Sequence, residues 1–289
     1  MVSLSRGVVG AAALVAGLIG LIALTAQAQT IEVYPEFRRL DPFGGTVAVD
    51  RAISPREILS PAVPRNGFAS FHIAISVPPK ESYLLYVATN PLNACRVALY
   101  REHFVKTPAG YITDTLTELT RLPDFGVMQD PDDNIEGQNT RLYLLDLWIP
   151  PDSSTARFRL EVQLKVADWI IHPLEFRPME IRIPDLPAPK QPVTLPAIEQ
   201  SADAVALDAI REYLGGLPAS ADPHPLTLRG IIRRNAEQDM ALAASLPRDI
   251  AGKDAIQRRV MELLAINNPL RTFGAEWYQR LRDFLFVQK

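Results

Sequence analysis

The segment Arg157–Val166, RFRLEVQLKV, decides the fold class. Apolar residues occupy every second position from Phe158 to Val166, and polar or charged residues occupy the positions between them. Successive side chains of an extended strand point to opposite faces, so this alternation predicts a β-strand with one buried face. Burying such side chains contributes about 1.5 to 3 kcal/mol each, or roughly 10 kcal/mol for the strand. A second layer must therefore cover that face.

Residues 29–184 continue in the same manner, as short segments of β-strand character separated by turn residues. Residues 68–77 and 83–88 are predicted to pair as one antiparallel hairpin, and residues 96–106 and 111–119 as another. The full set of expected strands is 31–34, 46–49, 68–77, 83–88, 96–106, 111–119, 141–149, 157–166 and 174–183.

Two of these strands carry further information about their surroundings. Residues 141–149 are apolar on both faces except for Asp146, which predicts a strand covered on both sides. Residues 174–183 contain Pro178, which cannot donate a backbone hydrogen bond, so this strand belongs at an edge or a bulge.

The succession of short strands, with no helix between them, indicates an antiparallel β-sandwich at residues 29–184. We expect an immunoglobulin-like architecture from the number of strands and the length of the domain. The Cys…Trp…Cys spacing of true immunoglobulin domains is absent from the sequence. The expected likeness is therefore one of architecture only.

The sequence changes character after the predicted sandwich. Residues 185–196 form a proline-rich linker, with polyproline II geometry as the expectation. In residues 197–289 the apolar period changes from two to 3.6, which predicts an α-helical region of about four amphipathic helices. Thr227 is expected to cap the second of them. The predicted helices are 202–214, 227–246, 251–266 and 272–287.

The N-terminal 28 residues have the features of a secretory signal peptide. Arg6 is their only charged residue, Val8–Leu24 is continuously apolar, and Ala26-Gln27-Ala28 matches a cleavage site. The alternative is a retained N-terminal anchor, because the length of the apolar run is close to the minimum of about 17 residues that can span a bilayer. Either interpretation predicts that residues from Gln29 onward lie outside the cytosol, in the periplasm or the extracellular space.

The net charge and the number of cysteines limit which partners and which covalent cross-links we expect. The formal net charge is −3, which gives no sign of a nucleic-acid partner. Cys95 is the only cysteine, so an internal disulfide is excluded and the fold must depend on its core. We expect Cys95 to be a small buried side chain, with an intermolecular bridge as the alternative.

The sequence contains no nucleophile elbow, no zinc-protease motif, no C-x-x-C and no phosphate-binding glycine pattern. We therefore expect a non-enzymatic protein without a cofactor. The alternative in another class is a secreted glycan-binding or glycan-hydrolysing protein, because paired carboxylates can cleave glycosidic bonds. Its candidate acids are Glu102, Asp114, Glu118 and Asp146.

Two patterns suggest a metal. The acidic loop QDPDDNIEGQN predicts an irregular calcium site formed by Asp130, Asp132, Asn134 and Glu136, because calcium prefers carboxylate and amide oxygens. A plain acidic turn is the alternative. In a second hypothesis, His72 and His103 lie on neighbouring strands and bind zinc together with Glu102 or Asp114.

Together these features predict an exported, non-enzymatic binding or assembly protein of the cell envelope. Its partners are expected to be proteins, bound through the helical tail or the sheet edges. The alternative is a membrane-anchored accessory subunit of a larger complex, with membrane attachment only if Val8–Leu24 is retained.

Overall fold

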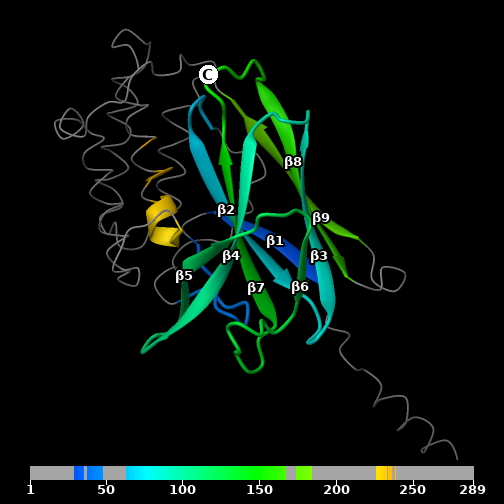
Figure 1. Ribbon diagram of the computed structural model, residues 1–289, viewed down its shortest axis with the longest axis vertical. Coiled ribbons are helices and arrows are strands. Elements are labelled where there is room, and N and C mark those ends of the chain that lie inside the picture. The colour runs from blue at the N-terminus through cyan, green and yellow to red at the C-terminus, as the bar shows by residue number, and fades with distance from the viewer. Residues whose placement is uncertain are drawn as a thin grey trace, which may run out of the picture.

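Antiparallel strands in two sheets make up most of the residues that the computed structural model describes (Figure 1). The structure describes residues 29–35, 38–47, 63–166, 174–183 and 226–232, together with Arg234, Asn235 and Gln238. The predicted leader, the proline-rich linker and most of the predicted helical region lie outside these residues. Among the described residues, no helix is both long and apolar enough to cross a membrane.

One sheet has the strand order β1-β2-β7-β4-β5, and the other has the order β6-β3-β8-β9. All of the pairings are antiparallel. The strands are β1 (Thr30–Pro35), β2 (Phe68–Ser76), β3 (Ser82–Asn90), β4 (Arg96–Thr107), β5 (Gly110–Glu118), β6 (Asp124–Val127), β7 (Thr140–Trp148), β8 (Arg157–Val166) and β9 (Glu175–Arg182).

Most of the predicted strands are confirmed, one predicted pairing is wrong, and one predicted strand lies partly outside the described residues. The expected hairpin between residues 68–77 and 83–88 is wrong, because β2 pairs with β1 and β7 whereas β3 lies in the other sheet, between β6 and β8. Their short connection crosses from one sheet to the other. The weak strand expected at 46–49 is reduced, within the described residues, to an isolated bridge between Leu40 and Thr46.

The inner faces of the two sheets share one apolar core, which fits the predicted β-sandwich. The alternating apolar residues of β8 are at most 2% exposed, and they pack in the same cluster as Phe71, Ile73 and Leu145 of the opposite sheet. Polar contacts also span the layers, and in one of them the hydroxyl groups of Tyr83 and Tyr143 lie 2.7 Å apart. Tyr143 donates to Asp124, so Tyr83 is the donor in the pair.

The outer face of the five-stranded sheet is covered by a later part of the chain. The Leu116 amide of β5 donates to the Leu226 carbonyl at 3.0 Å, so this segment pairs with the edge of the sheet. A helix begins at Leu228, and the Thr227 hydroxyl accepts a hydrogen bond from the Gly230 amide, which confirms the predicted cap. Figure 1 shows this helix beside the sheet, and its apolar side chains Leu228, Ile231 and Ile232 are buried.

A buried polar network joins this helix to the middle of the sheet and explains the one acid in β7. Arg234 donates to both carboxylate oxygens of Asp146 at 2.7 Å. The Ser70 hydroxyl donates to the same carboxylate, and the Asn235 amide donates to Ser70. Burial raises the pKa of Asp146, whereas the charge of Arg234 acts in the opposite direction. The prediction that β7 is covered on both faces is confirmed.

Cys95 lies in the apolar core, as expected for a small buried side chain. Burial raises the pKa of the Cys95 thiol to about 12.

At pH 8 an unfolded thiol, with a pKa of about 8.5, has on the order of a thousand times more thiolate than the buried Cys95 thiol. Native protein should therefore react with a chromogenic thiol reagent about a thousandfold more slowly than protein in guanidinium chloride. Equal rates would place the thiol outside the core.

Candidate functional site

The loop between β6 and β7, residues 128–139, crosses from one sheet to the other and holds the four residues of the predicted calcium site. Its backbone is left-handed at Gln129, Asn134 and Gly137. These turns bring the loop back toward the start of β7 and the end of β4. The loop therefore closes one end of the space between the sheets.

Asp130 anchors this loop in the interior. Its carboxylate forms an ion pair with the Arg141 guanidinium, and both side chains are almost completely buried. The Asp132 amide donates to the other oxygen of Asp130 at 3.0 Å. Arg141 also donates to the Val127 carbonyl at 2.9 Å, so the same guanidinium ties the loop to β6. The pair supplies charge compensation where water is excluded.

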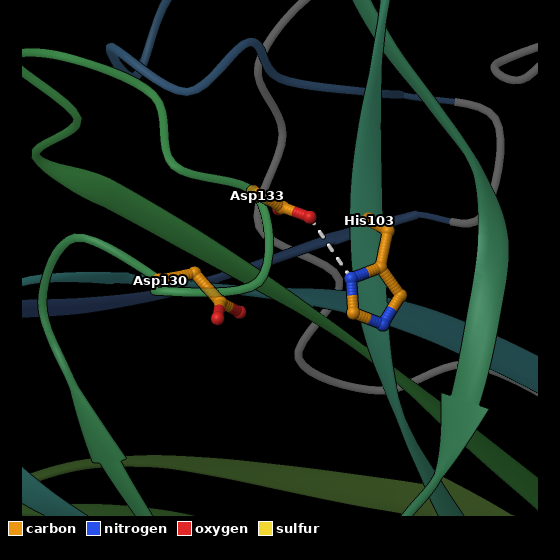
Figure 2. Close-up of side chains that lie close together, drawn as sticks. All are labelled: His103, Asp130 and Asp133. Atoms are coloured by element: carbon orange, nitrogen blue, oxygen red, sulfur yellow. Dashed lines mark hydrogen bonds and ion pairs between the residues drawn. The ribbon is translucent and has the colours of Figure 1, made fainter.

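His103 of β4 meets the loop through Asp133. Its Nδ1 lies 3.0 Å from Asp133 Oδ1, and its Nε2 lies 2.8 Å from the Thr117 hydroxyl on β5. Figure 2 shows the Asp133 carboxylate aimed at the ring, with Asp130 further along the same loop. One donor atom from each of His103, Asp130 and Asp133 lies within 4.8 Å of the others. A ring nitrogen and two carboxylates are a plausible ligand set for a divalent cation.

The four residues of the predicted calcium site lie in different environments. Asp130 is buried and paired, as described, whereas Asp132, Asn134 and Glu136 are exposed. The Asp132 side chain is 69% exposed, and its carboxylate lies 4.0 Å from the Arg101 guanidinium. The structure does not bring these four side chains together, and Asp133, which the prediction left out, points inward instead.

The hypothesis that His72 and His103 bind one metal is wrong. β7 lies between β2 and β4, and His72 turns to the outer face of the sheet, where its Nδ1 lies 2.6 Å from Glu102 Oε1. His103 follows Glu102 on β4 and so points to the opposite face. The side chains of His72 and Glu102 are fully buried, and the second oxygen of Glu102 has no hydrogen-bond partner among the described residues.

The acids considered for glycan chemistry lie in different environments. Asp114 occupies the extra position of the bulge opposite His103 and Phe104, and it accepts a hydrogen bond from the Arg229 amide at 3.1 Å. Burial raises the pKa of Asp114, and that hydrogen bond acts against it. Glu102 and Asp146 are buried in the contacts described above, and Glu118 is exposed.

A pocket of about 590 Å³ lies elsewhere, at the ends of three strands in the four-stranded sheet. It is lined by Asn90, residues 157–159 and residues 178–180. Its charged pair, Arg157 and Glu180, is solvent-exposed at 3.0 Å. None of the four candidate acids lines it.

Apolar side chains gather on the outer face of the same sheet. Phe125 of β6 is 77% exposed, and Val127 and Tyr86 are also exposed. Leu84 is directly opposite Phe125 in the β3–β6 register, so these side chains share one face. We call Leu84, Tyr86, Phe125 and Val127 the β3–β6 patch. Sequence reasoning missed β6, because its four residues are too few to show a periodic pattern.

No family model and no curated protein sequence matches the chain. A family 123 glycoside hydrolase from Clostridium perfringens is similar in structure, with 8% identity, a TM-score of 0.40, and coverage of 66% of this chain and 35% of that chain. Sporulation control protein Spo0M from Bacillus subtilis has 8% identity, a TM-score of 0.26, and coverage of 64% and 55%. A PapD-like domain of human CEP192 has 8% identity, a TM-score of 0.25, and coverage of 65% and 99%. Likenesses of this size say nothing about activity.

The two neighbouring acids Asp130 and Asp132 give a direct test of what organises the loop. Asp130→Ala leaves the Arg141 guanidinium buried without its carboxylate, which should lower the free energy of unfolding by about 3 to 5 kcal/mol. Asp132→Ala removes an exposed carboxylate and should change it by less than about 0.5 kcal/mol. Urea unfolding measured by fluorescence compares the two variants. Equal effects would contradict the assignment of Asp130 as the anchor.

Proposed function

We propose that the protein is an exported, non-enzymatic binding or assembly protein of the cell envelope, built on an immunoglobulin-like sandwich. The strand order supports this architecture. In immunoglobulin domains strands A-B-E-D form one sheet and C-F-G the other. β1-β2-β7-β4 and β3-β8-β9 have the same orders along the chain, with β5 and β6 as additional edge strands. Many cell-surface domains use this architecture as a scaffold.

The observation that carries the proposal is the contrast between the two outer sheet faces. On the five-stranded sheet that face is covered by the chain itself, through Ile231, Ile232 and the Arg234–Asp146 pair. On the four-stranded sheet the β3–β6 patch remains exposed. Contiguous apolar surface with a polar border is typical of a protein-binding site. The border here includes Gln163 and Lys165 of β8, opposite Tyr86 and Leu84.

The backbone contacts of β6 favour a partner that binds the side chains of the patch over a partner that pairs a β-strand with the edge of β6. The Met128 amide donates to the Glu81 carbonyl of the neighbouring β3 segment at 3.0 Å, so the backbone groups of Phe125 and Val127 point to the free edge. The Val127 carbonyl is already bonded to Arg141. We therefore infer a partner protein that covers the β3–β6 patch with an apolar surface. Such a partner suits either an exported protein or a membrane-anchored accessory subunit.

Site-specific photocrosslinking in the native host tests the proposal. A photoreactive phenylalanine analogue at Phe125, in a C-terminally tagged full-length chain, should give one discrete crosslinked partner that mass spectrometry identifies. The same analogue at Leu92, which is 81% exposed outside the patch, is the matched control. Val127→Asp, which places a charge in the patch, should abolish the crosslink at Phe125.

Equal crosslinking at positions 125 and 92, or none at 125, would refute a partner at the β3–β6 patch. The mass of the purified chain also separates the two forms of the proposal. A chain beginning at Gln29 indicates an exported protein without its leader, and a chain retaining Val8–Leu24 indicates the anchored subunit.

A further inference from the structure

We propose that His103, Asp130 and Asp133 bind one divalent transition-metal ion, which clamps the β6–β7 loop onto the β4–β5 hairpin. The three residues come from two segments that meet only in the folded protein, since His103 is on β4 and both acids are in the loop. Their donor atoms lie within 4.8 Å of one another. Zinc ligands at about 2.0 to 2.2 Å from a tetrahedral ion are roughly 3.4 Å apart. A shift of about 1 Å completes such a site.

The imidazole decides the class of metal. Calcium and magnesium prefer oxygen ligands, whereas an imidazole nitrogen suits zinc, copper, iron and nickel. His103 is held by Thr117 at Nε2, and its Nδ1 points at Asp133. A carboxylate only accepts hydrogen bonds, so Nδ1 carries the proton in this contact. When Nδ1 binds the metal, the neutral imidazole carries its proton at Nε2 instead, and the Thr117 hydroxyl accepts that hydrogen bond. The predicted calcium site contained no nitrogen ligand.

The surroundings of the carboxylates resemble the outer shell of a metal site. Arg141 and the Asp132 amide hold the Asp130 carboxylate, and the Phe104 amide lies 3.4 Å from Asp133 Oδ2. Ligating carboxylates and imidazoles usually have such partners, which fix their orientation. Two carboxylates beside one guanidinium leave one negative charge when the imidazole is neutral. A divalent cation is therefore attracted to this end of the sandwich.

Calorimetric titration of the untagged full-length protein tests the site, with Zn²⁺ and Ca²⁺ as separate probes. Wild-type protein should bind one Zn²⁺ in the cluster and melt at a higher temperature with Zn²⁺ than with chelator. Asp133→Asn and His103→Gln should each weaken binding about tenfold or more, and Thr117→Val should weaken it by about tenfold through loss of the Nε2 partner. Melting in chelator verifies that each variant is folded.

Asp132→Asn is the matched control, because it changes an exposed acid of the same loop that lies outside the cluster. It should bind Zn²⁺ as the wild type does. Three results would overturn the proposal: no Zn²⁺ binding by the wild type, equal losses in Asp132→Asn and Asp133→Asn, or Ca²⁺ binding as tight as Zn²⁺ binding. This site is independent of the β3–β6 patch, so photocrosslinking at Phe125 is expected to succeed or fail separately.

Discussion

The packing of two sheet faces against each other is the interaction on which the rest of the structure depends. With Cys95 as the only cysteine, no internal disulfide constrains the chain, so the sheets are held by the apolar surface that they bury. The inner residues of β8 supply one side of this core, and those of β2 and β7 supply much of the other. Loss of contact between the two sheets would expose both sides of this core at once.

The two outer faces then determine what each sheet can do. The central strands β2 and β7 of the five-stranded sheet are buried on both faces, because the helix that begins at Leu228 lies on the sheet and Arg234 satisfies Asp146 there. The four-stranded sheet exposes the β3–β6 patch, and the β6–β7 loop beside it is held by the buried pair Asp130–Arg141. Our proposals concern these two neighbouring regions, one apolar and one rich in carboxylates.

Much of the fold could be predicted because alternation is a local signal. Residues 157–166 form β8 with the predicted bounds, and residues 141–149 predicted the doubly covered β7 from its apolar content alone. The partner of a strand is not a local property. The local patterns of residues 68–77 and 83–88 fit either a hairpin or strands of different sheets, and only the packing of the whole core distinguishes the two arrangements.

The candidate site shows the same limit. The acidic loop could be identified by its composition. Which of its acids face inward could not be predicted, because the turn at Asn134 and the burial of Arg141 depend on the surrounding sheets. His103 is 30 residues from Asp133 in sequence. Its approach to the loop depends on the β4–β5 hairpin, which was predicted and is confirmed, and on the pairing of β4 with β7, which no sequence pattern indicated.

Hydrogen exchange of the native protein, followed by mass spectrometry with peptide resolution, tests the central claim that both sheets share one core. Amides of β7 and β8 should be the slowest to exchange and should do so together, because each becomes exposed only when the layers separate. Protection factors on the order of 10³ or more are expected, since an unfolding free energy of about 5 kcal/mol corresponds to such values. If β7 exchanged far faster than β8, the two sheets would not form a common core.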